Sequence, residues 1–231
     1  MTGPNPIHEA WAAVRAVRVP FVGIQVAMLL IAGAYALSPA FRESLAGLAE
    51  FRQRGGYLFA GVGMVVAGVA VPEIARRLSG LRSEVTSGRL LILYLVYFGL
   101  LGAIVAGLYD VMASVLGDAQ DLLGIAIRLA LDMAVFTPLV SMPLATFVFS
   151  WRDAGFRLDG VAIESRSGEL KRRYVRLIVS SWLFWTPVLI AVYAVPLPLQ
   201  YPLALVAEAA WALMMLSLER HEAGRHGAVP A

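Results

Sequence analysis

Six long apolar segments alternate with short polar stretches along the chain, at residues 20–37, 57–75, 90–116, 122–151, 177–196 and 198–219. An α-helix needs about 20 apolar residues to cross the hydrocarbon core of a bilayer, with a workable range of roughly 17–25. The third and fourth segments are longer than this, so they are expected to tilt, kink or protrude. The pattern predicts an all-α, multi-pass membrane helix bundle with about six transmembrane helices. No hydrophilic stretch is long enough for a second domain, so residues 1–231 are expected to form a single integral membrane domain.

The basic residues lie mostly between the apolar segments and favour one orientation. If the N-terminus is cytoplasmic, fifteen of the nineteen lysines and arginines lie on the cytoplasmic side, three lie on the opposite side, and Arg128 falls inside the fourth segment. Cytoplasmic loops of membrane proteins carry such an excess of positive charge. We therefore expect both termini and the loop at 152–176 to be cytoplasmic. Lys171, Arg172 and Arg173 in that loop either fix the topology or contact anionic lipid headgroups.

The composition agrees with a membrane location and argues against several kinds of chemistry. Only 15% of the residues are charged, whereas soluble domains contain about 25%. Cysteine is absent, and the histidines, His8, His221 and His226, lie near the ends of the chain. We therefore expect no catalytic residues, no metal site, no cofactor and no enzyme activity. The basic residues flank apolar segments, which indicates a bilayer rather than nucleic acid as the partner. One lysine against eighteen arginines is typical of a high-GC bacterial source, so we expect a bacterial inner (cell) membrane.

Small residues form two ridges on the third predicted helix. Gly99, Ala103 and Gly107 recur every four residues, and Gly102 and Ala106 make a second ridge beside them. Helices in lipid approach each other closely where small residues line the contact. We expect the first ridge, Gly99, Ala103 and Gly107, to pack against a neighbouring helix.

Two prolines interrupt the fourth predicted helix. Pro138 and Pro143 each remove a backbone donor and can kink a helix. Carbonyl groups freed at membrane depth must be satisfied by protein or water. This helix is therefore expected to kink and to face the interior of the bundle.

Asp132 is a carboxylate inside the same helix. At a rise of ~1.5 Å per residue it lies ~15 Å along a helix that begins near Leu122, which is around mid-bilayer. A charged residue at that depth costs at least ~2.5–3.5 kcal/mol, so a partner is expected. Arg128 precedes it by four residues on the same helix face, and we expect the two side chains to pair.

Three other polar residues fall at a similar depth. The fourth and sixth helices both run inward from the outer surface, and Glu208 follows Pro198 by ten residues. The third helix runs outward and carries Tyr109 and Asp110 in the same outer half. Three carboxylates around one arginine are over-acidic, so one is expected to be protonated or to face water. The expected intramembrane polar cluster consists of Arg128, Asp132, Glu208, Tyr109 and Asp110.

Three phrases then suggest a family. They are FGLLGAIVAGLYD at 98–110, RLALDMAVFTP at 128–138, and the stretch from Trp182 to Trp211. In order and spacing they resemble the Mpv-seventeen/PMP twenty-two family of peroxisomal and mitochondrial inner-membrane proteins, over roughly residues 97–219. Either of the helices at 20–37 and 57–75 can stand for the family's first helix, which leaves the other as an extra. The matching positions are Phe98, Gly99, Gly102, Gly107, Tyr109, Arg128, Asp132, Phe136, Pro138, Trp182, Trp185, Pro187, Tyr193, Val195, Pro196 and Trp211.

The resemblance implies a small multi-pass protein of a kind proposed to form pores for small solutes. We therefore expect a channel or passive transporter of small metabolites, with the Asp132 region lining or gating it. The alternative is a non-transporting scaffold or stabilising subunit. It is favoured by apolar residues where the family has polar ones, such as Met133 after Asp132, and Val188 and Val192 in the fifth helix.

Overall fold

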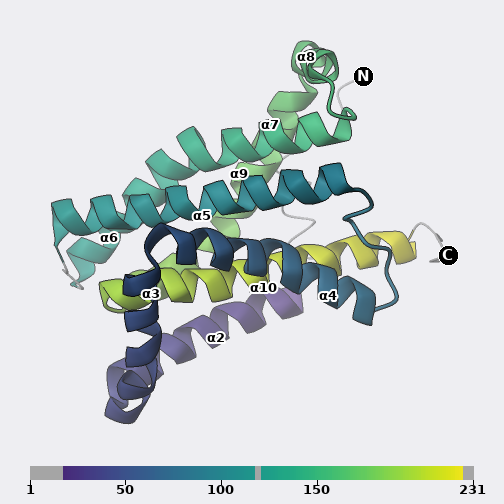
Figure 1. The fold of residues 1–231 in the computed structure, drawn as a ribbon. Coiled ribbons are helices and arrows are strands. Elements are labelled where there is room, and N and C mark those ends of the chain that lie inside the picture. The colour runs from purple at the N-terminus through teal and green to yellow at the C-terminus, as the bar shows by residue number, and fades with distance from the viewer. Residues whose placement is uncertain (1–17, 118–120, 226–231) are drawn as a thin grey trace.

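The chain folds into a helical bundle. The computed structural model describes residues 18–117 and 121–225 (Figure 1), and these contain helices and no strand, which confirms the predicted fold class. His8, His226 and part of the expected cytoplasmic N-terminus lie outside the described residues. In chain order the elements are α2 (Arg18–Leu37), α3 (Pro39–Val65), η1 (Val66–Ala70), α4 (Val71–Leu78), α5 (Gly88–Leu116), α6 (Leu122–Ala130), η2 (Leu131–Ser141), α7 (Met142–Asp153), α8 (Leu158–Ser167), α9 (Glu169–Tyr193) and α10 (Leu197–Arg225).

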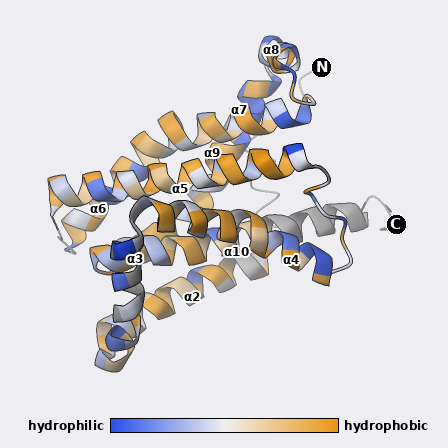
Figure 2. Cartoon of the chain, viewed as in Figure 1, coloured by the Kyte–Doolittle hydropathy of each residue, from blue (hydrophilic) through white to orange (hydrophobic). Residues whose placement is uncertain are grey.

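The helices are long and apolar enough for a multi-pass membrane protein. Within the described chain, five stretches meet this requirement: Arg54–Leu78, Gly88–Leu116, Leu122–Asp153, Glu169–Tyr193 and Leu197–Met214. A sixth span results if α2 is counted together with the start of α3, to which it is bent by 108°. Figure 2 shows apolar residues along the length of α5, α7 and α9, with hydrophilic residues gathered at α8 and at the adjoining ends of α7 and α4.

The elements define two ends of the bundle. The ends of α4 and α7, the start of α5, and α8 lie at one end (Figure 1), which we call the basic end. The α2–α3 bend at Ser38, the end of α5 and the α9–α10 turn lie at the other, which we call the opposite end. Helices α5, α6–α7, α9 and α10 run between the two ends.

Two segments expected as connections are helical. Residues from Pro39 onward form the first part of α3, because Ser38 caps the helix by accepting a hydrogen bond from the Phe41 N–H at 3.2 Å and Pro39 suits its first turn. The helix then turns at Gly56, whose φ of 51° strongly favours a residue without a Cβ. At the basic end, α8 and the charged start of α9 occupy most of the expected loop at 152–176.

Helices α3 and α5 meet at Gly102. A Cβ placed there would lie 2.5 Å from the Ala60 carbonyl oxygen and 2.7 Å from Met64 Cβ. Tyr201 reaches the same point from α10, because its hydroxyl lies 2.9 Å from the Ala60 oxygen and 3.1 Å from the Gly102 oxygen. The second ridge, with Gly102 and buried Ala106, thus makes the tightest contact.

The expectation for the first ridge is corrected at one position. A Cβ at Gly107 would meet no atom within 4 Å, so the expected close contact of Gly107 with a neighbouring helix is wrong. Ala103 is half-buried. Gly99 contributes through its backbone, since its carbonyl oxygen would lie 3.0 Å from a Cβ at Gly61. The helix face turned toward α3 is therefore centred on Gly102, about one position away from the expected ridge.

This geometry predicts opposite outcomes for two glycine substitutions. Gly102→Ala should lower the melting temperature in detergent, because overpacking against a backbone carbonyl costs about 1–3 kcal/mol. Gly107→Ala should leave it unchanged or raise it, since alanine is the better helix former by about 1 kcal/mol. Equal shifts for the two variants would show that the α3–α5 approach is not at Gly102.

Candidate functional site

A polar cavity lies in the middle of the bundle, between α5, η2, α7, α9 and α10. This central cavity has a volume of about 180 Å³. Most of its wall is apolar, but it includes both Asp132 and Glu208. Two carboxylates from helices far apart in sequence are thus brought to one cavity, as their predicted depths indicated. The polar side chains in its lining are those of Tyr97, Tyr109, Asp132, Thr137, Ser141, Ser181 and Glu208.

Asp132 is held by two hydroxyl donors. It is buried, and its two carboxylate oxygens accept from Tyr193 Oη at 2.6 Å and from Thr137 Oγ1 at 3.3 Å. Thr137 is five residues further along, a spacing that an α-helix would place on a different face. The π-helix η2, whose backbone bonds join residues five apart, brings the two side chains together.

The expected pair of Asp132 with Arg128 is not formed. Thr137 and Tyr193 account for the hydrogen bonds of Asp132 among the described residues. Arg128 is completely buried and donates instead to the carbonyl oxygen of Gly117, before the start of α6. Long side chains on a helix point back toward its N-terminus, so an arginine four residues before an aspartate leans away from it. This order of charges is also the weaker one at that spacing.

The remaining cluster residues divide between cavity and surface. Tyr109 is buried and lines the central cavity with Asp132 and Glu208. Asp110 is exposed, and neither it nor Arg128 lines the cavity. The structure therefore brings together Asp132, Glu208 and Tyr109 and places the other two members of the expected cluster elsewhere.

Two prolines of the fourth span leave backbone carbonyl groups without a donor, and side chains of α9 satisfy these carbonyl groups. In a π-helix, the N–H of residue 138 would donate to the carbonyl oxygen of Met133, and proline has no N–H. The indole Nε1 of Trp182 donates to that oxygen instead, at 2.8 Å. Pro143 likewise follows Pro138 by five residues, and the Tyr174 hydroxyl donates to the Pro138 oxygen at 3.0 Å. Leu122–Asp153 thus remains one continuous span, although η2 interrupts its α-helical geometry.

Three tyrosines pack together beside the central cavity, near the turn between α9 and α10. Tyr109 packs edge-to-face against Tyr193 and Tyr201, with ring centroids 5.8 and 5.9 Å apart. Tyr193 is the last residue of α9 and Tyr201 lies near the start of α10, and both are buried. We call these residues the tyrosine cluster. Of the three, Tyr109 lines the central cavity and Tyr193 donates to Asp132 in its wall.

A second cavity opens toward the basic end. This inner cavity has a volume of about 340 Å³ and is lined by charged side chains from several elements. It shares five wall residues with the central cavity, and Glu208 is the charged one among them. Glu208 therefore lies at the junction of the two cavities. The shared residues are Phe98, Phe149, Leu177, Glu208 and Trp211.

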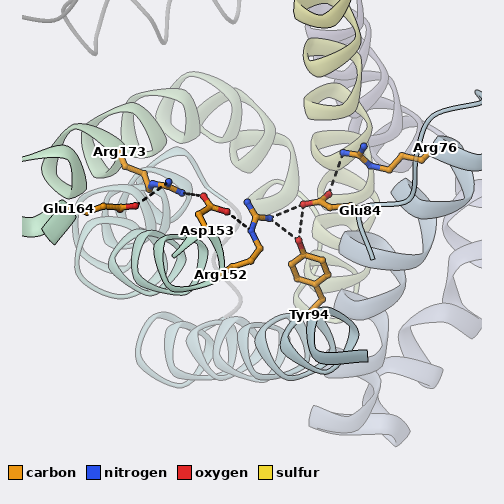
Figure 3. A network of polar contacts seen from close by, with 7 residues as sticks. All are labelled: Arg76, Glu84, Tyr94, Arg152, Asp153, Glu164 and Arg173. Carbon is orange, nitrogen blue, oxygen red and sulfur yellow. Dashed lines mark hydrogen bonds and ion pairs between the residues drawn. The ribbon is translucent and has the colours of Figure 1, made fainter. Parts of the chain in front are cut away.

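A network of ion pairs borders the inner cavity (Figure 3). Arg152 on α7 lies 2.8 Å from Glu84, which belongs to the α4–α5 loop, and 2.8 Å from Asp153. Tyr94 on α5 donates to the same Glu84 at 2.8 Å. The network thereby holds the loop against α5 and α7. Its members are Arg76, Glu84, Tyr94, Arg152, Asp153, Glu164 and Arg173.

The basic cluster expected to face lipid headgroups is divided by this network. Arg173 faces inward, since it lines the inner cavity and lies 2.7 Å from Asp153. Lys171 and Arg172 remain exposed, and Arg172 lies 3.6 Å from Glu169. Two of the three basic residues are therefore on the surface.

Several site residues were missed by the sequence reasoning. Tyr193 and Trp182 were identified only as family positions and Tyr174 only as part of the 152–176 loop, although they supply the donors for η2. Their signal is the five-residue spacing of Pro138 and Pro143, which matches the π-helical repeat. The inner network had no signal, because its members come from distant loops and helix ends.

No family model, curated protein or solved structure matches this chain. Among the described residues there is also no group of three or more histidine, aspartate or glutamate side chains that could hold a metal ion.

A double-mutant cycle tests the proline compensation. Trp182→Phe should destabilise the protein by about 1–3 kcal/mol, because it leaves the Met133 carbonyl unsatisfied at membrane depth. In a Pro138→Ala background the new N–H can reach that carbonyl, so the same change should cost much less. Free energies of unfolding in detergent for the four variants give the coupling. An equal cost of Trp182→Phe in both backgrounds would assign the loss to indole packing.

Proposed function

We propose that this protein is a channel or passive transporter that lets small solutes cross the membrane through the inner and central cavities. The observation that carries the proposal is the shared wall at Glu208, which joins a polar entrance at the basic end to a polar cavity in mid-bundle. Polar side chains deep in a membrane bundle commonly mark the path of a solute. The family resemblance agrees with this function.

The dimensions suit a small metabolite. An engineered cavity of about 150 Å³ in another protein holds benzene, and the central cavity has about 180 Å³. Hydroxyl groups of Thr137, Ser141 and Ser181 offer hydrogen bonds to a polar solute there. A solute that reaches Asp132 meets the tyrosine cluster, so passage requires that Tyr109, Tyr193 and Tyr201 move apart.

The orientation and location complete the proposal. The positive-inside distribution supports a cytoplasmic basic end, and in that orientation the inner cavity opens to the cytoplasmic side. The arginine bias favours a bacterial inner membrane. Exposed Lys171 and Arg172 at this end suit contact with anionic headgroups.

One observation favours the alternative, a non-transporting scaffold or stabilising subunit. Both oxygens of Asp132 accept hydrogen bonds from within the bundle. A carboxylate used in this way can serve purely to join η2 to α9. In the scaffold, the cavities would have no transport role.

Filling the central cavity separates the two functions. Ala145 is buried in the cavity wall, and Ala145→Leu should reduce the flux of a small neutral solute such as glycerol by about tenfold, equivalent to about 1.4 kcal/mol of added barrier. Ala126 is exposed, and Ala126→Leu adds the same three carbons outside the cavity. The measurement is solute-driven swelling of proteoliposomes.

Wild type and Ala126→Leu should give equal solute flux, and Ala145→Leu should give a much lower flux. The melting temperatures of the three proteins should be the same. Wild-type protein that gives no more flux than empty liposomes would instead support the scaffold.

A further inference from the structure

We infer that Glu208 is a cation-binding residue at the junction of the two cavities, which gives the passage a preference for positively charged species. The ligand is a positively charged species that binds to the Glu208 carboxylate: a proton, a monovalent metal ion or a small organic ammonium ion. The inference deepens the proposed function and rests on it for its transport measurements.

Glu208 differs from the other carboxylates of the two cavities in having no partner. Asp132 accepts from Tyr193 and Thr137, Glu73 lies 3.1 Å from Arg77, and Glu84 pairs with arginines. Within the described part of the chain, Glu208 has neither a hydrogen bond nor an ion pair. It is half-buried and lines both cavities.

The nearby arginines are already neutralised. Arg152 lies between Glu84 and Asp153, and Arg173 lies 2.7 Å from Asp153 and 4.0 Å from Glu164. These pairs hold the positive charges at the rim of the inner cavity, while Glu208 remains at its inner limit. An isolated carboxylate in a low-dielectric interior is costly, so it favours a cation or a proton beside it.

Other titratable and charged side chains line the same two cavities as Glu208. On the central side they are Asp132 of η2 and Tyr97 and Tyr109 of α5. On the inner side they are Glu73, Arg76, Glu84, Tyr94, Arg152 and Arg173. Arg152 and Arg173 form ion pairs with Glu84 and Asp153. Their positive charges are therefore balanced by carboxylates other than Glu208.

Ion selectivity in liposomes tests the inference. Wild type, Glu208→Gln and the control Glu50→Gln are compared, since Glu50 is an exposed carboxylate paired with Arg54 at 2.6 Å. Under a KCl gradient, wild type and Glu50→Gln should prefer K⁺ over Cl⁻ by at least about tenfold, which corresponds to about 1.4 kcal/mol. Glu208→Gln should lose this preference. Acidification should weaken it in the wild type, because a proton neutralises the carboxylate.

Replacing K⁺ with tetramethylammonium, or following protons with a pH-sensitive dye, identifies the cation. Any of these fluxes that requires Glu208 supports the inference. A cation preference that survives Glu208→Gln, or a wild type that conducts ions but does not distinguish K⁺, tetramethylammonium and H⁺ from Cl⁻, overturns it.

An infrared titration tests binding at Glu208 without measuring transport. The protonated-carboxyl band of the full-length protein should change with pH, and one carboxyl's share of that change should be missing in Glu208→Gln. If no solute crosses the liposomes, the proposed function fails while this result still supports the inference. A titration that is identical in wild type and Glu208→Gln contradicts cation binding at Glu208, whatever the fluxes are.

Discussion

Backbone polar groups at membrane depth must be satisfied by the protein or by water, and this constraint shapes the fourth span and all that packs on it. The span contains a carboxylate and two prolines, and it forms an eleven-residue π-helix in its middle. The adjacent helix α9 supplies three donors to it. Tyr193 donates to Asp132, Trp182 to the Met133 carbonyl and Tyr174 to the Pro138 carbonyl.

This joint between η2 and α9 positions the site. Because Asp132 is held toward Tyr193, it lies beside the tyrosine cluster, which is in turn fixed by the bonds of Tyr201 at the α3–α5 contact. The same arrangement leaves an open volume on the other side of Asp132, extending to Glu208. The part of the cavity wall at Asp132 is thus built from satisfied polar groups, and the part at Glu208 contains the carboxylate that is not satisfied.

The helical fold could be predicted from the sequence, whereas most side-chain contacts could not. The lengths of the apolar segments predicted the helical bundle, and the common depth of Asp132 and Glu208 predicted their shared cavity. The pairing of Arg128 could not follow from depth, because it depends on the direction in which a long side chain leans. The π-helix was also hidden, since an apolar run has no period that separates it from an α-helix. The ion pairs of Glu84 and Arg152 join positions 68 residues apart, and no local pattern encodes them.

The central claim is that the cavity beyond Glu208 is an aqueous space reached from the basic end. The chain has no cysteine, so single introduced cysteines report on water, because the thiolate that attacks a thiol reagent forms readily only where the thiol is hydrated. Ser181 is buried in the central cavity wall, whereas Leu139 of η2 is 70% exposed on the outside of the bundle. In liposomes, a small methanethiosulfonate reagent supplied on the side of the basic end should modify Ser181→Cys and leave Leu139→Cys unmodified, because a cysteine at position 139 faces lipid and forms little thiolate. An unreactive Ser181→Cys would contradict the account, because it would make the cavity a dry space with no connection to the solvent.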